Sequence, residues 1–130
     1  MSMENDKGII RVLIVEDSPL MAKTIETILS ADPSISVVGI AHDGREAVSA
    51  VAQLKPDLVT MDLEMPVMDG LEATKQIMAY HPTPILVVSL SSSVGKSSQI
   101  FEAISYGALD FIDKKNLELL NQARSKAFIH

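Results

Sequence analysis

Hydrophobic residues fall into short, regularly spaced groups along this chain, and the groups alternate between two periodicities. Five short runs, ended by polar or turn-forming residues, are typical of buried β-strands. These runs are residues 9–15, 36–41, 58–61, 85–89 and 110–113. Between them, apolar residues recur three or four positions apart, which is the spacing of one face of an α-helix. The predicted helices have their apolar positions within residues 21–29, 47–54, 71–78, 100–104 and, more weakly, 117–129.

The regular alternation of strands and helices predicts the architecture. A chain of five strand–helix units, (βα)5, favours an α/β fold with one parallel sheet and helices on both of its faces. A strand that is covered on both faces is apolar almost throughout, as residues 9–15 are. We therefore predict a flavodoxin-like, doubly wound parallel five-stranded sheet with strand order 2-1-3-4-5. In such a sheet, a crevice opens at the carboxyl ends of the first and third strands.

Composition narrows the class of protein further. The chain has 130 residues, 47% of them hydrophobic, which suits one domain at residues 9–130 after a disordered N-terminal tail of residues 1–8. It contains no cysteine, and no apolar run approaches the roughly 20 residues of a membrane helix. No signal peptide is recognisable, so we expect no membrane association. The formal charge of −6 disfavours direct binding to nucleic acid, which needs basic patches.

Polar side chains stand at the edge of the sheet where the crevice is predicted to open. Glu16 and Asp17 follow the first strand, Asp62 the third and Lys114 the fifth, and Ser89 is the last residue of the fourth. Three carboxylates brought together repel one another unless a cation joins them. Because their ligand atoms are hard oxygens, we predict that the cation is Mg²⁺.

This set of residues suits the transfer of a phosphoryl group. Mg²⁺ bound by carboxylates commonly also binds a phosphate, and a carboxylate can act as a nucleophile that carries an aspartyl-phosphate. The charge on the transferred oxygens needs cations and hydrogen-bond donors already in position. We predict that Asp62 attacks the phosphoryl group, while Glu16 and Asp17 hold the metal. Lys114 and Ser89 are expected to bind phosphoryl oxygens.

Four segments that contain these residues resemble a known family. They are Val15-Glu-Asp-Ser18, Met61-Asp-Leu-Glu-Met-Pro-Val-Met-Asp-Gly70, Val88-Ser89 and Gly107-Ala-Leu-Asp-Phe-Ile-Asp-Lys114. Together they are similar to the receiver domain of two-component response regulators. The resemblance extends over residues 9–114 with every motif in order, and it is strongest to the receivers of chemotaxis methylesterases.

The resemblance adds two residues to the site and names the roles of the others. It implies that the backbone carbonyl of Glu64 is a ligand of Mg²⁺ and that Phe111 is a switch aromatic. The residues already predicted take the roles of phosphoacceptor (Asp62), acidic pair (Glu16 and Asp17), switch hydroxyl (Ser89) and phosphate-binding lysine (Lys114).

The function that the resemblance implies is signalling by phosphorylation. A sensor histidine kinase or a phosphotransfer protein would deliver the phosphoryl group. A downstream effector protein or domain would read the altered surface of the fourth helix, fifth strand and fifth helix, through which a homodimer is also expected. Such a domain is not an enzyme in the usual sense, since it catalyses only its own phosphorylation and slow autodephosphorylation. The resemblance also implies a cytoplasmic location.

Two positions depart from the family pattern. Lys115 stands where the family usually has proline. Because a cis bond before a non-proline residue costs about 3 kcal/mol, the sequence argues against a cis peptide after Lys114. Leu90 follows Ser89 where a small residue is commoner, and we hypothesise that its bulk shields the phosphoryl group and slows hydrolysis.

Two other functions are compatible with parts of the pattern. A pseudo-receiver would use the same fold as a protein-interaction module that is never phosphorylated, although every site residue is present here. A Mg²⁺-dependent phosphatase of the haloacid dehalogenase type would also use an aspartate nucleophile at a strand end. Its signature has a second aspartate two residues later, where this chain has Glu64.

Overall fold

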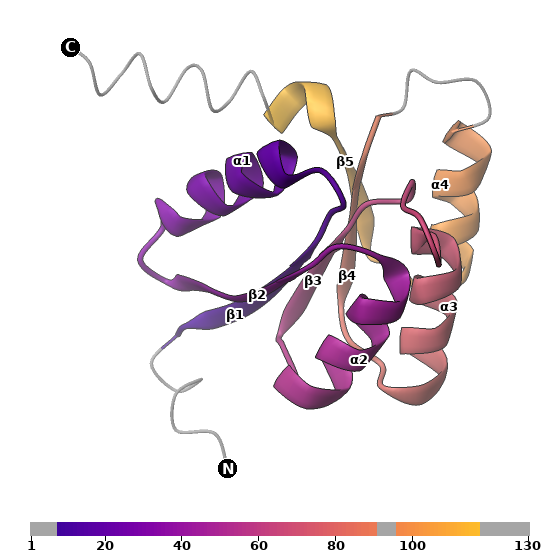
Figure 1. Cartoon of the computed structure of the whole chain (residues 1–130), viewed down its shortest axis with the longest axis horizontal. Coiled ribbons are helices and arrows are strands. Elements are labelled where there is room, and N and C mark those ends of the chain that lie inside the picture. Colours follow the sequence, from indigo (N-terminus) through magenta and orange to yellow (C-terminus); the bar gives the residue numbers. More distant parts are fainter. Residues whose placement is uncertain (1–7, 91–95, 118–130) are drawn as a thin grey trace.

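The computed structural model of the chain describes residues 8–90 and 96–117, in which strands and helices alternate (Figure 1). In chain order the elements are β1 (Ile10–Val15), α1 (Pro19–Ser30), β2 (Ile35–Ala41), α2 (Gly44–Leu54), β3 (Leu58–Met61), α3 (Gly70–Tyr80), β4 (Ile85–Ser89), α4 (Lys96–Ser105) and β5 (Asp110–Asp113). The strands form one parallel sheet in the order β2-β1-β3-β4-β5. The predicted fold class and strand order are therefore confirmed.

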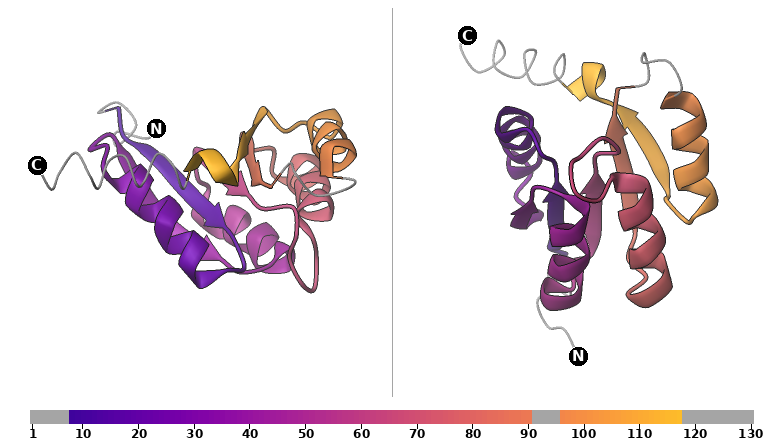
Figure 2. Two further views of the ribbon diagram at one scale, coloured as in Figure 1. Left: turned by 90° about the horizontal axis from the view of Figure 1, so that it is seen from above. Right: turned by 45° about the vertical axis from the view of Figure 1, so that its right-hand side comes forward.

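Hydrophobic side chains cover both faces of the sheet, and they alternate along β1, which lies between β2 and β3. Leu13 and Val15 belong to a core cluster on one face, while Val12 and Ile14 belong to a cluster on the other. The first cluster includes side chains of α2, α3 and α4, and the second includes side chains of α1, in keeping with the helix layers in Figure 2. None of the four side chains is more than 1% exposed. Burial on both faces explains why this strand is apolar almost throughout.

Polar residues determine where three of the helices begin. Ser18, Asp43 and Asp69 are the N-caps of α1, α2 and α3, and each side chain accepts a hydrogen bond from a backbone N–H three residues later. Pro19 occupies the first position of α1, where its missing N–H costs nothing. The N-caps fix the point at which each strand–helix loop ends and its helix begins. These loops carry polar residues of the predicted site.

Helix α4 buries only part of its predicted apolar positions. The sequence predicts a helix with apolar residues at Ile100, Phe101 and Ile104. In the structure, Ile100 and Ala103 are buried, while Phe101 is 72% exposed and Ile104 is 41% exposed. The small side chain of Ala103 lets α4 approach the sheet on that side. An apolar pair, Phe101 and Ile104, is consequently left on the surface of α4.

Several predictions about the ends of the chain cannot be compared with the structure. Residues 1–7 of the expected tail, and all but the first residue of the helix expected over 117–129, lie outside the described residues. The domain limits of 9–130 therefore stay a prediction. Within the described residues no peptide bond is cis, so the bond after Lys114 is trans as expected. In the same residues, no helix combines the length and the hydrophobicity needed to span a membrane.

Candidate functional site

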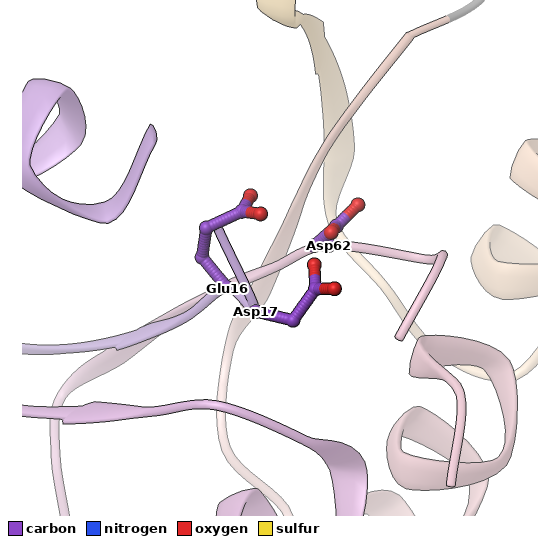
Figure 3. A group of neighbouring side chains, drawn as sticks. All are labelled: Glu16, Asp17 and Asp62. Atoms are coloured by element: carbon purple, nitrogen blue, oxygen red, sulfur yellow. The ribbon is translucent and has the colours of Figure 1, made fainter. Parts of the chain in front are cut away.

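The carboxyl ends of β1 and β3 bring three acidic side chains together (Figure 3). The two strands are neighbours, and their last residues, Val15 and Met61, are paired in register. Asp62 continues this pairing, because its backbone N–H donates to the carbonyl oxygen of Val15 at 3.0 Å. As a result, carboxylate oxygens of Glu16, Asp17 and Asp62 lie within 4.8 Å of one another. The predicted convergence of the acids is thus present in the structure.

The three acids differ in burial. Glu16 is 1% exposed and Asp62 is 3% exposed, whereas Asp17 is open to solvent. Two residues contact Glu16. The backbone N–H of Ser18 donates to the side-chain Oε2 of Glu16 at 3.1 Å, and His42 Nδ1 lies 3.2 Å from the backbone carbonyl oxygen of Glu16. The contacts of Ser18 and His42 with Glu16 are not among the features predicted from the sequence. The position of Ser18 directly after the acidic pair was a usable signal, but nothing in the sequence marked His42.

Lys114 places a positive charge between the two buried acids. It follows the edge strand β5, and its Nζ lies 2.8 Å from Glu16 Oε1 and 3.3 Å from Asp62 Oδ1. The ammonium therefore neutralises part of the charge that was predicted to require a cation. Three carboxylates against one ammonium still leave an excess of negative charge, so the cluster remains suited to a further cation.

Burial governs the protonation of this cluster. Burial raises the pKa of Glu16 to about 7, against the opposing effect of its hydrogen bond with Lys114, and it also raises the pKa of Asp62. Burial alone would lower the pKa of Lys114, but the hydrogen bond with Glu16 and the charge of Asp62 outweigh that effect and raise it. Near neutral pH, Lys114 is therefore charged while Glu16 is close to the midpoint of its titration.

The raised pKa of Glu16 predicts that the metal-free protein is less stable at pH 8 than at pH 6. Glu16 has an ordinary pKa of 4.5, so the folded state holds an extra proton between that pH and about 7. Because the folded state binds more protons there, the free energy of unfolding falls as the pH rises through this window. Thermal unfolding in EDTA at the two pH values measures the effect, and Glu16→Gln should remove most of it. An equal or higher melting temperature at pH 8 would contradict the prediction.

A cavity of about 200 Å³ opens at this cluster. It is lined by Glu16, Asp17, Ser18, Asp62, Glu64, Ser89, Leu90 and Lys114. Every residue predicted for the site is among them except Phe111. The acids supply hard carboxylate oxygens, which are the ligands that Mg²⁺ prefers, and these oxygens are close enough together to share one ion. The residues of the cavity therefore fit Mg²⁺.

The two residues with a predicted switch role take different positions. Ser89 is the last residue of β4, is 2% exposed and lines the cavity. Phe111 lies in β5, paired in register with Val87, and its half-buried side chain packs against the core cluster shared by α2, α3 and α4. Phe111 therefore belongs to the strand next to that of Ser89, but it does not line the cavity.

The loop between β3 and α3 has a strained conformation beside the site. Val67 has a φ of 68°, in the left-handed region that β-branched residues rarely adopt. The N–H of Met68 donates to the carbonyl of Pro66 at 2.7 Å across Val67, which is the hydrogen bond of a γ-turn. At the base of the loop, the N–H of Glu64 donates to Asp62 Oδ1 at 3.3 Å. The bond to Asp62 restrains the backbone of Glu64, whose carbonyl is a predicted metal ligand.

The fold and this set of residues match a known family. Residues 12–124 match the response regulator receiver domain, and the chain belongs to that family. It is therefore a receiver domain of a two-component response regulator.

Individual relatives indicate the type of receiver. The response regulator domain of Thermotoga maritima CheB, known from a crystal structure, has a sequence 40% identical to that of this chain. The match covers 90% of this chain and 95% of that domain, and the TM-score is 0.77. Two proteins named protein-glutamate methylesterase/protein-glutamine glutaminase are also similar. The one from Methanococcus maripaludis is 51% identical over 105 residues, which are 81% of this chain, and that from Geobacter sulfurreducens is 47% identical over 112 residues, which are 86%. The chain is thus a receiver of the methylesterase type.

The chain matches only part of these methylesterases. It spans 28% of the Methanococcus protein and 31% of the Geobacter protein. The matched part is the receiver domain, whereas the enzymatic activity in the names of these relatives lies in a separate domain that this chain does not cover.

Proposed function

We propose that Asp62 receives a phosphoryl group from a phosphohistidine of a sensor kinase or a phosphotransfer protein. The observation that carries the proposal is a buried carboxylate with an ammonium 3.3 Å away and two further acids beside it. A carboxylate oxygen of Asp62 attacks phosphorus, so that a P–O bond forms as the P–N bond breaks. The imidazole leaves with the electron pair. Such a partner implies a cytoplasmic location.

The remaining lining residues would stabilise the transferred group. Glu16, Asp17 and Asp62, with the backbone carbonyl of Glu64, would hold Mg²⁺. When bound, the ion supplies positive charge for the phosphoryl oxygens. Lys114 has three N–H donors, so it can bind a phosphoryl oxygen while it keeps a bond to an acid. Because all of these residues would act on a phosphoryl group carried by Asp62, the receiver would promote only the phosphorylation and dephosphorylation of its own aspartate. It would not turn over a separate substrate.

An Asp17→Asn variant is expected to bind Mg²⁺ at least about tenfold more weakly, because it loses a charged ligand. Asp17 is exposed, and Lys114 pairs with the other two acids, so the variant should remain folded. Isothermal titration calorimetry measures the affinity directly. Asp110→Asn is the matched control, since it removes an exposed charge that does not line the cavity. Equal affinities for Asp17→Asn and the wild type would exclude Asp17 from the metal site.

The response to phosphorylation would pass from Ser89 to the surface of α4 and β5. The Ser89 hydroxyl lines the cavity and would move to a phosphoryl oxygen, and Phe111 in the neighbouring strand would follow it. The exposed pair Phe101 and Ile104 on α4 suits an apolar contact with a protein. The names of the relatives make a linked methylesterase domain the effector that we propose, and a second receiver is the other partner for this surface.

Intact-protein mass spectrometry after incubation with Mg²⁺ and acetyl phosphate tests the proposed function. We expect a gain of one phosphoryl group that is absent in EDTA and is lost in mild base, as an acyl phosphate is. No gain in a protein that still binds Mg²⁺ would favour the pseudo-receiver, in which the fold serves only for protein binding. Continuous release of phosphate from a phosphomonoester would favour a phosphatase of the haloacid dehalogenase type.

A further inference from the structure

The residue before Lys114 carries a carboxylate that binds the backbone on the far side of that lysine. Asp113 is the last residue of β5, and its Oδ1 accepts a hydrogen bond from the backbone N–H of Lys115 at 3.0 Å. We propose that Asp113 is a positioning residue, which fixes the backbone of Lys114 so that the lysine ammonium reaches the acceptor site. This role rests on the proposed function, because it concerns the transfer of a phosphoryl group to Asp62.

The place of Lys114 in the sheet makes the position of its backbone important. Lys114 follows the edge strand β5, whereas Asp62 follows β3 and Glu16 follows β1, so β4 lies between the lysine and the nearer acid. Its Nζ nevertheless lies 3.3 Å from Asp62 Oδ1 and 2.8 Å from Glu16 Oε1. Neighbouring strands are about 4.8 Å apart, so a side chain that crosses them must start from a well-defined point. A change in the direction of the Lys114 backbone would move the ammonium away from both acids.

The chain changes from strand to helix at Lys114, and the pairing of the sheet does not extend to it. The last register pair between β4 and β5 joins Ser89 to Asp113, and residues 114–117 are helical. The first N–H groups of a helix have no partner within the helix, and an aspartate just before the helix commonly binds one of them. Because the acceptor is a carboxylate, the bond is of the stronger, charge-assisted kind. The bond to Asp113 therefore restrains Lys114 where the sheet no longer does.

The hydrogen bond depends on the kind of residue at position 115. Proline, which the family usually has there, restrains the backbone through its ring and has no N–H to donate. Lys115 lacks the ring but has the N–H, and its peptide bond to Lys114 is trans. Its side chain is exposed, and the bond to Asp113 uses its backbone. Asp113 and Lys115 thus supply by hydrogen bonding a restraint that a proline ring would supply covalently.

The rate of phosphorylation by acetyl phosphate in saturating Mg²⁺, followed by intact mass, tests this role. Asp113→Ala removes the acceptor, and we expect its maximal rate to fall roughly tenfold, because a small displacement of a positioned group costs a large factor in rate. Its Mg²⁺ affinity, measured by calorimetry, should not fall, since every predicted metal ligand is kept. Asp32→Ala is the matched control. Asp32 Oδ1 also accepts from the N–H two residues later, that of Ser34, at 2.9 Å, but the loop between α1 and β2 does not line the cavity, so the rate should be that of the wild type.

Two conservative variants separate the geometry of the hydrogen bond from the charge of Asp113. Asparagine keeps a side-chain oxygen at the same distance from the backbone and caps helices as well as aspartate does, so Asp113→Asn should keep a rate close to that of the wild type. Asp113→Glu keeps the charge on a longer side chain, and it should be as slow as Asp113→Ala. Melting temperatures verify that each variant is folded, and the comparison of Asn with Glu decides the role even if the alanine variant does not fold.

Several outcomes would overturn the role of Asp113. One is an equal maximal rate for the wild type and Asp113→Ala, and another is an equal rate for Asp113→Asn and Asp113→Glu. A loss of Mg²⁺ affinity in parallel with the loss of rate would also overturn it, since the substitution would then disturb the metal site rather than the lysine. A wild type that accepts no phosphoryl group would overturn the proposed function itself, whereas equal phosphorylation of all variants would overturn only the role of Asp113.

Discussion

An Asp62→Asn variant is expected to accept no phosphoryl group and yet to be more stable than the wild type. The amide of asparagine is not a nucleophile for phosphorus under these conditions, so phosphorylation should be lost completely. The gain in stability follows from burial, which raises the pKa of Asp62 and so disfavours its ionised form at neutral pH. Asparagine has the same shape without the charge, and Lys114 keeps its ion pair with Glu16 at 2.8 Å. We therefore expect the free energy of unfolding to rise in metal-free buffer.

Two measurements check this prediction separately. Intact mass after incubation with acetyl phosphate reports phosphorylation, and urea unfolding in EDTA reports stability. Asp110→Asn, an exposed substitution outside the cavity, should be phosphorylated normally and should leave stability almost unchanged. A phosphorylated Asp62→Asn protein would show that another residue is the acceptor. A loss of stability in this variant would show that the ion pair of Asp62 with Lys114 outweighs the cost of its burial.

Replacing Gly70 with alanine is expected to cost about 2–4 kcal/mol of stability and to disrupt the site at the same time. A Cβ atom at Gly70 would overlap the carbonyl oxygen of Asp62, and it would lie 2.8 Å from Leu63 Cα and 2.9 Å from the carbonyl carbon of Asp62. All of these are backbone atoms, so no side-chain rotation relieves the contact. The backbone of Asp62 or the start of α3 must move instead. We therefore expect weaker Mg²⁺ binding and slower phosphorylation, besides the loss of stability.

Gly39→Ala is the matched control for Gly70→Ala. A Cβ atom at Gly39 would meet Leu54 Cδ1 at 3.0 Å, which is the end of a flexible side chain that can move aside. Gly39→Ala should therefore cost less, and Mg²⁺ affinity should be unaffected because Gly39 does not line the cavity. Urea unfolding and calorimetric Mg²⁺ titration of both variants provide the comparison. Equal losses of stability would mean that the close approach of Gly70 to Asp62 is not the limiting contact.

The sheet and the positions of the polar residues at its edge could be predicted from the sequence for the same physical reason. An apolar run bounded by turn residues identifies a buried strand, and parallel strands that follow one another end at the same edge. Residues that directly follow such runs, as Asp62 and Lys114 do, are therefore expected to meet. The motif Val15-Glu-Asp-Ser18 also placed the acidic pair correctly, since no flexible segment separates it from β1.

The features that sequence reasoning did not predict depend on contacts between distant segments. The left-handed conformation of Val67 opposes the preference of valine and accompanies the hydrogen bond between its two neighbours. The exposure of Phe101 depends on which side of α4 meets the sheet, and apolar spacing does not decide this when both sides carry hydrophobic residues. His42 contacts Glu16 only because β2 lies beside β1.

The ion pair between Glu16 and Lys114 also determines when, during synthesis of the chain, the cluster of acids and lysine can form. The pair joins the residue after the first strand to the residue after the last strand. Bringing two residues so far apart in the sequence together costs chain entropy, and the contact offsets this cost only once it has formed. Lys114 reaches the acids only when β5 has docked on β4 at the edge of the sheet. A nascent chain that lacks β5 holds its acids without their lysine. The complete cluster of acids and lysine therefore forms only when the whole sheet has folded.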